Sequence, residues 1–351
     1  MDINGKHIIS QQQTFLDALK RINEIKTEPL VLFAVDKQGS MCGTITDGDI
    51  RRALIRGLNV NDEISMGMHR DFNFLRKGVN DDVVNLHRQR ELKMSLVPVL
   101  DADNHICEII NLKHYRTKLP IDAVLMAGGK GERLRPLTEQ TPKPLIKIGD
   151  KCIIDYNIDR LLFYGLTHIS VTINYLGEQI EEHFREERDG VKIHTVREPK
   201  YLGTIGSIRF VETFHNDTVL VMNSDLFTNI DYEDFFLHFC QHDADMSVAA
   251  VPYVVKIPYG VFNLTGREIR GITEKPTYSY YANAGIYLIK KERLNLIPKD
   301  DFFNATDFME KLIATNHKVI RYPISGYWID IGQHDELARA REMVKHLRQE
   351  Y

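Results

Sequence analysis

The sequence is poor in cysteine, and none of its four cysteines forms a C-x-x-C pair. Scattered cysteines of this kind give no disulfide framework and suit a reducing compartment. Long hydrophobic runs are lacking too: no stretch reaches membrane-spanning length, and the N-terminus has no apolar core of a signal peptide. Because the formal net charge is only −4, the chain is no general nucleic-acid binder. These absences predict a cytoplasmic protein that binds neither membrane nor nucleic acid.

The 351 residues are enough for two domains or three small ones, and 43% of them are hydrophobic. A polar, positively charged segment that ends in proline, residues 113–120, predicts a linker. After it, in residues 121–351, short apolar runs alternate with helical patterns. That alternation predicts an α/β domain with a mostly parallel sheet covered on both faces. Before it, residues 1–116 form a separate, small α+β unit.

The strongest signal runs from Ala123 to Leu145 and reads AVLMAGGKGERLRPLTEQTPKPL. An apolar stretch with the length of a buried strand ends at three glycines, which let the backbone turn and approach a ligand. Free N–H groups in such a loop point at an anion. Prolines stiffen the segment, and four cations follow the strand: Lys130, Arg133, Arg135 and Lys143. The stretch predicts a triphosphate site. It is not a P-loop, because Gly131 follows Lys130 where a P-loop has Ser or Thr.

The pattern G-G-x-G-x-R-L-x-P-L-T, then P-K-P-L, resembles the sugar-phosphate nucleotidyltransferases, which make nucleoside diphosphate sugars. The resemblance covers residues 121–332 and implies a Rossmann-like, GT-A-like fold. It implies that Arg133 stabilises the leaving pyrophosphate and that Lys143 holds phosphates. It also assigns nucleotide contacts to the strand and the glycine loop: Leu125, Ala127, Gly128, Gly129 and Gly131.

Two aspartates lie far from this loop in the sequence. Asp225 directly follows a hydrophobic strand, and Asp330 lies in the segment WIDIG near the end. The resemblance implies that the two jointly hold Mg²⁺ between the triphosphate and the sugar phosphate. Mg²⁺ prefers hard oxygens and uses one or two carboxylates together with substrate phosphates. For either residue alone, a helix cap or a loop hydrogen bond is the alternative.

Residues 197–207, REPKYLGTIGS, resemble the segment that reads the base, which implies contacts from Gly203 and Thr204. Where uridylyl- and thymidylyltransferases of the family usually carry glutamine, this chain has Glu198. A carboxylate accepts two parallel hydrogen bonds, which guanine offers through N1–H and N2–H₂, whereas the uracil carbonyls repel it. A polar mismatch in a buried site costs about 1–3 kcal/mol. Glu198 therefore predicts GTP. Cytosine, which donates through N4–H₂, stays open, and so does a Glu198 that faces water.

Three later motifs match the family's sugar side: PYGV around Gly260, EKP at Glu274 and Lys275, and N-x-G-I-Y from Asn283. The resemblance implies that Gly260 touches the hexose and that Glu274 accepts sugar hydroxyls. It gives Lys275 the 1-phosphate and Asn283 a hydroxyl or amine. The implied reaction is in-line attack of a sugar 1-phosphate oxygen on the α-phosphorus. Since the nucleophile is already an anion, no general base is required.

Residues 1–116 contain an approximate repeat of roughly 60 residues, strand-turn-strand-helix each time. The segment GTITDGD resembles a pair of cystathionine-β-synthase (CBS) domains. This implies that Thr46 and Asp49 bind the ribose of an adenine nucleotide, with Arg51 or Arg52 near its phosphate. The second copy departs from the pattern, because Asn111 and His114 stand where Thr and Asp are expected. A unit that only dimerises the enzyme is the alternative.

Together these motifs predict transfer of GMP from GTP to a hexose 1-phosphate, with Mg²⁺ as cofactor. The whole arrangement is similar to glucosamine-1-phosphate guanylyltransferases of legionaminic acid synthesis, which makes glucosamine 1-phosphate the expected acceptor. A uridylyl- or cytidylyltransferase is one alternative. A nucleotide-sensing CBS protein with an inactive transferase half is another. The expected partners are GTP, the sugar phosphate, an adenine or guanine nucleotide at the CBS pair, and further copies of the same chain.

Overall fold

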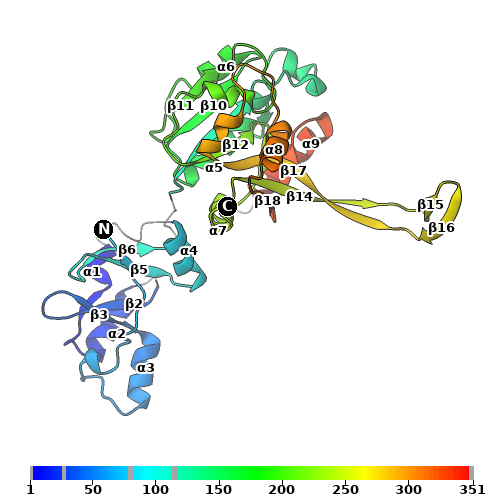
Figure 1. Cartoon of the computed structure of the whole chain (residues 1–351). Coiled ribbons are helices and arrows are strands. Elements are labelled where there is room, and N and C mark those ends of the chain that lie inside the picture. The colour runs from blue at the N-terminus through cyan, green and yellow to red at the C-terminus, as the bar shows by residue number, and fades with distance from the viewer. Residues whose placement is uncertain (1–2, 26–28, 78–82, 113–117, 348–351) are drawn as a thin grey trace. The chain divides into compact units, whose positions relative to one another are not determined.

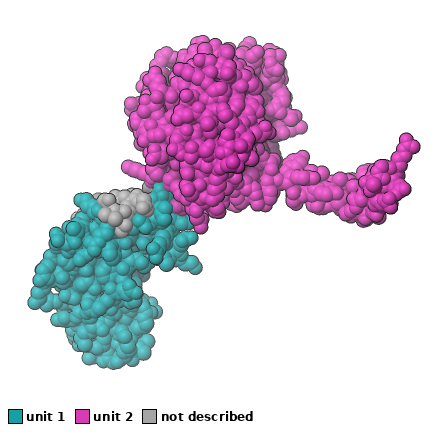
Figure 2. Space-filling view, in the orientation of Figure 1, with its two compact units in different colours: residues 1–117 teal, residues 118–351 magenta. Residues whose placement is uncertain are grey.

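The computed structural model describes residues 3–25, 29–77, 83–112 and 118–347. The chain divides into two compact units, Met1–Thr117 and Lys118–Tyr351, which Figure 2 colours separately. The predicted linker lies mostly at residues 113–117, outside the described part of the chain. No helix within the described ranges is long and apolar enough to cross a bilayer.

Unit 1 contains the same motif twice. Its elements are α1 (Ile3–Lys6), β1 (Ile8–Ser10), α2 (Phe15–Glu24), β2 (Val31–Val35), β3 (Met41–Thr46), α3 (Asp47–Ile55), β4 (Leu75–Arg76), α4 (Val83–Glu91), β5 (Leu96–Leu100) and β6 (Ile106–Asn111). The sheets β1-β2-β3 and β4-β5-β6 each pair their first two strands parallel and their last two antiparallel. β5 starts at Leu96, 65 residues after β2 starts at Val31. The strand-turn-strand part of the predicted repeat is thus confirmed in both copies, whereas the helix that should follow is present only as α3 in the first copy among the described residues.

The two copies of the motif share a hydrophobic core. Phe33 and Met41 from the first sheet are buried together with Leu96, Leu100 and Ile109 from the second. Burying these side chains against each other removes apolar surface that neither sheet could cover alone. Unit 1 is therefore one folding body made of two halves.

Unit 2 is built on a seven-stranded sheet of order β11-β10-β7-β12-β17-β14-β18. These strands are β7 (Ile121–Ala127), β10 (Ile169–Ile173), β11 (Ile193–Arg197), β12 (Thr218–Asn223), β14 (Met246–Lys256), β17 (Thr277–Lys290) and β18 (Val319–Pro323). Every neighbouring pair is parallel except the two that involve β17, which runs antiparallel to both β12 and β14. The predicted α/β fold with a mostly parallel sheet is confirmed (Figure 1).

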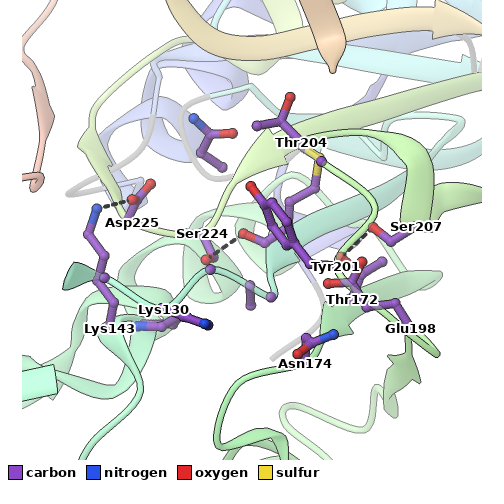
Figure 3. Close-up of a pocket in the computed structure, with 18 of the residues that line it drawn as sticks. Lys130, Lys143, Thr172, Asn174, Glu198, Tyr201, Thr204, Ser207, Ser224 and Asp225 are labelled. Carbon is purple, nitrogen blue, oxygen red and sulfur yellow. Dashed lines mark hydrogen bonds and ion pairs between the residues drawn. The ribbon is translucent and has the colours of Figure 1, made fainter. Parts of the chain in front are cut away.

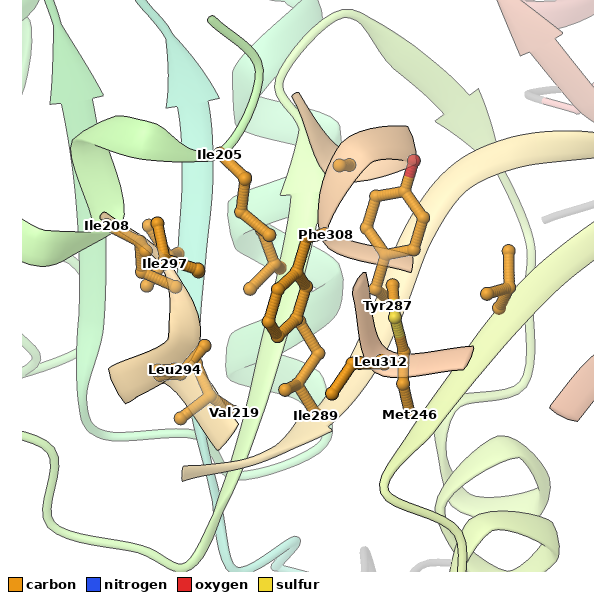
Figure 4. Close-up of a cluster of buried hydrophobic side chains, with 14 residues drawn as sticks. Ile205, Ile208, Val219, Met246, Tyr287, Ile289, Leu294, Ile297, Phe308 and Leu312 are labelled. Carbon is orange, nitrogen blue, oxygen red and sulfur yellow. The ribbon is translucent and has the colours of Figure 1, made fainter. Parts of the chain in front are cut away.

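Both faces of this sheet are covered, as alternation along β12 demonstrates. Val219 and Val221 point to one face and pack in a cluster with Phe308 and Leu312 of α8 (Figure 4). Leu220, between them, points to the opposite face and is also fully buried. The helices of unit 2 are α5 (Ile153–Phe163), α6 (Gly177–His183), α7 (Tyr232–Gln241), α8 (Ala305–Ala314) and α9 (His334–Leu347). The short strands β8 (Lys147–Ile148), β9 (Lys151–Cys152), β13 (Leu226–Thr228) and β19 (Trp328–Asp330) complete the body.

One helix is shorter than the sequence predicts. The pattern in residues 177–187 predicts a single helix, but α6 ends at His183. The next residue, Phe184, is buried, and Lys192 donates to its carbonyl oxygen at 3.3 Å. A lysine on the returning chain thus takes over carbonyl groups that a longer helix would have bonded internally. The spacing of Leu337, Met343 and Leu347 predicts an amphipathic helix from Asp335 to the end; α9 confirms it as far as Leu347, and the last residues lie outside the described part.

A feature that the sequence did not predict is a long two-stranded arm, residues 252–281, which leaves the body of unit 2 (Figures 1 and 2). β14 and β17 stay paired beyond the sheet, in unbroken register from Ala250↔Asn283 to Lys256↔Thr277. A hairpin of β15 (Val261–Thr265) and β16 (Glu268–Thr273) forms the tip. Nearly all side chains of the arm are exposed.

Candidate active site

A cavity of about 680 Å³ opens in unit 2 where β7, β10, β11 and β12 end (Figure 3). Parallel strands have their carboxyl ends at one edge of a sheet, so the loops that follow them meet there. The volume is that of a typical small-molecule site. Most residues predicted from the sequence as nucleotide-binding or catalytic line this cavity: Ala127, Gly128, Gly129, Gly131, Arg133, Lys143, Glu198, Gly203, Thr204 and Asp225.

The glycine loop packs against the segment that follows it in the chain, at Thr138 and Lys143. Gly131 has the left-handed φ of +64°, and a Cβ there would lie 2.9 Å from Thr138 and 3.1 Å from the Cβ of Lys143. Thr138 Oγ1 donates to the Gly131 carbonyl at 2.9 Å. Only glycine combines that backbone conformation with that close approach. Gly131 therefore lets Lys143 pack directly against the loop.

Glu198 lies over the start of the loop, at the opposite side of the cavity from Lys143 (Figure 3). Its Oε1 is so close to Gly128 that a Cβ there would be only 2.0 Å away. Its Oε2 accepts a hydrogen bond from the Leu202 N–H at 3.1 Å. Glu198 is 5% exposed as a residue, so the alternative in which it faces bulk water is wrong. Burial raises the pKa of this carboxyl above its ordinary value, against the opposing effect of the Leu202 hydrogen bond.

The two aspartates, far apart in the sequence, are neighbours in space. Asp330 ends β19, which pairs antiparallel with β13. In this pairing Asp330 lies opposite Leu226, the residue after Asp225. The N–H of Ile331 donates to the Asp225 carbonyl at 3.2 Å. Lys143 Nζ forms an ion pair with Asp225 Oδ2 and lies 4.0 Å from Asp330 Oδ1. The small β13–β19 sheet therefore holds both carboxylates around one ammonium group.

The surroundings of the aspartates fit a divalent cation. Asp225 Oδ1 is buried and has no hydrogen-bond partner among the described residues. Burial raises the pKa of Asp330, and the Asp225 carboxylate adds to this, against Lys143 and Arg133. Two hard carboxylates that repel each other, one with an unused oxygen, are a donor set suited to Mg²⁺. Asp330 itself is not among the residues that line the cavity, although Gly332 is.

Arg133 reaches this cluster from the glycine loop. Its guanidinium packs against Gly332, where a Cβ would lie 3.1 Å from Nη2. The arginine thus stands between the loop and the segment that carries Asp330. The loop cation, the lysine and Asp225 line one end of the cavity, with Asp330 4.0 Å from the lysine, while Glu198 occupies the other end.

Several cavity residues were not assigned from the sequence. Tyr201 lines the space between the two ends (Figure 3), and its ring contacts Phe302 edge-on at 5.8 Å. Ser207 donates to Thr172 at 3.1 Å beside Glu198. Thr172 lies inside a strand whose pattern looks wholly structural, so only its position near the strand end signals a site. Tyr201 lies within the REPKYLG segment, so it is the residue among these three that the sequence could have indicated as part of the site.

Other predicted residues do not reach the cavity. Leu125 is fully buried within β7. Gly260, Glu274 and Lys275 lie on the arm. Asn283 lies at the base of the arm, where its amide donates to Tyr287 Oη at 2.9 Å. The structure therefore assembles the predicted nucleotide side in one copy of the chain and leaves the predicted sugar side apart from it.

In unit 1, Thr46 and Asp49 form the start of α3. Thr46 is the N-cap, and Asp49 Oδ2 accepts from the Thr46 N–H at 2.9 Å and from its hydroxyl at 2.6 Å. The other oxygen of Asp49 accepts from Arg52 at 2.6 Å. This capping box gives both residues a structural role. Asp49 and Arg52 also line a cavity of about 440 Å³. Of the second copy's departures, Asn111 ends β6, and His114 lies outside the described residues.

Comparison with known proteins gives one family. A family model described as nucleotidyl transferase matches residues 122–346. A Sulfolobus acidocaldarius protein named "Putative mannose-1-phosphate guanyltransferase" is 31% identical over 216 residues, and the mannose-1-phosphate guanyltransferase beta-A of Xenopus laevis is 28% identical over 226. Each match covers 60% of this chain, and the chain spans about 60% of the length of the curated relatives it matches. The solved structure of HddC from Yersinia pseudotuberculosis is 24% identical, with a TM-score of 0.49, and the match covers 64% of this chain and 99% of that one.

Proposed function

Because the chain belongs to the nucleotidyl transferase family, we propose that it transfers GMP from GTP to a hexose 1-phosphate and releases pyrophosphate. The observation that carries the choice of GTP is the buried carboxylate of Glu198, which is pressed against Gly128 in the cavity. A buried carboxylate there accepts two parallel hydrogen bonds from the guanine edge and repels the carbonyl groups of uracil or thymine. The relatives' names, which include mannose-1-phosphate guanyltransferases, support the same base.

The cavity has two chemically different ends, and this supports one orientation of the nucleotide. Glu198, Thr172 and Ser207 at one end would hold the base, and the glycine loop toward Lys143 and Arg133 would hold the triphosphate. Backbone N–H groups and two fixed cations neutralise the charge that develops as pyrophosphate leaves. Tyr201, between the ends, offers an aromatic surface beside the base.

The reaction needs positioning and charge neutralisation rather than a base. One anionic oxygen of the sugar phosphate forms a bond to the α-phosphorus as the bond to the leaving pyrophosphate breaks. Arg133 binds the departing phosphates, and Lys143 orients the triphosphate. Asp225 and Asp330 would hold Mg²⁺, which supplies additional neutralisation between the two phosphate groups when bound.

The acceptor is a hexose 1-phosphate, and two sugars have support of different kinds. The relatives' names point to mannose 1-phosphate. The domain arrangement of the sequence points to glucosamine 1-phosphate and to legionaminic acid synthesis. Glu274 and Asn283 accept either substituent at C2, because a carboxylate and an amide bond to hydroxyl and amine alike.

A matrix of pyrophosphate-release assays tests this function. GTP, UTP, CTP and dTTP are each combined with mannose, glucosamine and glucose 1-phosphates, with Mg²⁺ and with EDTA. We expect turnover with GTP and one of the first two sugars, and none with EDTA. Preference for UTP or CTP would overturn the assignment to guanine. Turnover with no pair, in protein that binds nucleotides at unit 1, would support the nucleotide-sensing alternative.

We also propose that unit 1 binds a nucleotide in the cavity beside Asp49 and Arg52. An arginine next to a carboxylate suits a phosphate and a ribose in one small cavity. Calorimetric titration of the full chain with AMP, ADP and GDP tests this, with Arg52→Ala as the variant. Arg51 pairs with Asp47 and does not line this cavity, so Arg51→Ala is the matched control. Binding that persists unchanged in Arg52→Ala would contradict it.

A further inference from the structure

Many of the large hydrophobic side chains that are exposed among the described residues lie on the arm. Tyr259 is 75% exposed, and nearly half of the exposed large hydrophobic side chains in the described ranges lie on this one segment. They are Tyr253, Val254, Val255, Tyr259, Phe262, Leu264, Ile269, Ile272, Tyr278, Tyr280 and Tyr281. An isolated hairpin is marginal in water, and an apolar surface of this extent marks an interaction site. The arm therefore needs a partner surface.

The corner between the long strands and the tip carries a small cluster of its own. A Cβ on Gly260 would lie 3.0 Å from Glu274 Oε2, so the two residues are in contact within the arm. Lys275 follows with a left-handed φ of 45°, at the point where the chain turns into β17. These are the residues predicted to hold the sugar phosphate. Among the described residues, none from the arm lines the nucleotide cavity.

The arm leaves the sheet beside that cavity. β14 runs parallel to β12, since both are antiparallel to β17, so β14 enters the arm at the same edge where the cavity opens. The unbroken ladder from Ala250↔Asn283 to Lys256↔Thr277 then directs the arm away from its own body. In this arrangement Glu274 and Lys275, which lie beyond the end of the ladder, stay away from the cavity of their own copy.

The length and the charge of the arm favour a second copy of this chain as its partner. The arm extends up to about 40 Å, comparable to the width of about 45 Å expected for a domain of this size. Its charged residues are mostly basic, Lys256, Arg267, Arg270 and Lys275 against Glu268 and Glu274, so it would complement the negative charge of the triphosphate that the proposed function puts in the cavity. An element that leaves beside its own site is placed to enter the site of a facing copy across a two-fold axis.

We propose that two copies exchange arms, so that the arm of each closes the nucleotide cavity of the other and brings Glu274 and Lys275 to the sugar phosphate bound there. This inference rests on the proposed function for the identity of the ligand. Each active site is then composite: the body of one copy binds GTP, and the arm of the other binds the acceptor.

Complementation between two inactive variants tests the exchange. Arg133→Ala damages a body and Lys275→Ala damages an arm, and neither change removes a buried apolar side chain. When the two full-length variants are co-expressed in equal amounts and the whole, unfractionated dimer population is assayed, we expect about a quarter of wild-type activity, because half the dimers are mixed and one of their two sites is intact. A mixture no more active than its components would overturn the proposal. Co-expressed Arg133→Ala and Lys143→Ala, which both damage bodies, serve as the matched control and should stay inactive.

A second measurement does not depend on activity. A benzophenone amino acid in place of Tyr259, in an equal mixture of ¹⁴N- and ¹⁵N-labelled full chains, is irradiated with GTP present. We expect cross-links that join one label to the other and end in peptides of residues 127–133 or 198–207. Cross-links within a single copy, or to peptides away from the cavity, would overturn the exchange. If wild-type protein turns over no substrate pair, the proposed function fails, while this cross-link still decides where the arm lies.

Discussion

The wall of the nucleotide cavity and the arm both carry motifs of the predicted active site, but the side chains of these motifs lie in opposite environments. On the wall, Glu198 is buried and Lys143 is fixed against two acids. On the arm, Glu274 and Lys275 sit on a two-stranded ribbon with exposed side chains. Motif order along a chain predicts which residues share a chemistry. It does not predict whether one copy of the chain brings them together.

The largest difference should appear when a charge is removed from the wall. Arg133→Ala should lower kcat at least about 100-fold, because a positioned cation stabilises the charge of the leaving pyrophosphate. Pyrophosphate release at saturating substrates measures this, with circular dichroism as a check on folding. Lys147→Ala, an exposed cation outside the cavity, is the matched control and should change kcat less than twofold. An Arg133→Ala enzyme that keeps most of its activity would show that the glycine loop does not bind the polyphosphate.

The next effect concerns the choice of nucleotide and the pH dependence of the KM for GTP. Glu198→Gln should raise KM for GTP about 10- to 100-fold and improve relative use of UTP, since an amide replaces an acceptor-only group. Burial raises the pKa of Glu198, so the side chain takes up its proton at a higher pH than an exposed glutamate does. As the pH falls through that pKa, the wild-type KM for GTP should rise while kcat changes little. The variant should lack that rise, and a rise of equal size in both proteins would contradict the role of Glu198.

A smaller effect is expected at the more exposed of the two acids. Asp330→Asn should raise the Mg²⁺ concentration for half-maximal activity about tenfold, because the cation loses one of two charged ligands. Titration of activity with Mg²⁺ in chelator-treated protein measures it. Asp335→Asn, on the same C-terminal segment, is the control and should leave the titration unchanged. An identical Mg²⁺ requirement in Asp330→Asn would remove that residue from the metal site.

The smallest effect on folding should come from the arm. Ile269→Ser at the tip removes an exposed side chain, so the free energy of unfolding should change by no more than about 0.5 kcal/mol. Association between copies should weaken in the same variant, as sedimentation at several concentrations would reveal. A clear loss of stability without any change in association would mean that the arm packs on its own body.

Much of this organisation follows from local sequence. The apolar run before Gly128 predicts β7, Thr14 predicts the cap of α2, and the order of motifs predicts the cavity. The arm could not be predicted, because alternating β-branched and aromatic residues such as those in β17 are equally typical of a strand inside a sheet. Nor could Leu125 be separated from its cavity-lining neighbour Ala127, since alternation in a strand covered on both faces does not mark which end meets a ligand.

The missing side chain at Gly128 has a consequence for altering nucleotide choice. The carboxylate of Glu198 occupies the volume where a methyl group at position 128 would stand. Even alanine there would push Glu198 out of place, so the proposed selectivity for guanine would depend jointly on two positions distant in the chain. A library that randomises Glu198 alone therefore varies only one of the two positions. Side chains of a different length at position 198 become useful only when residue 128 is varied together with them.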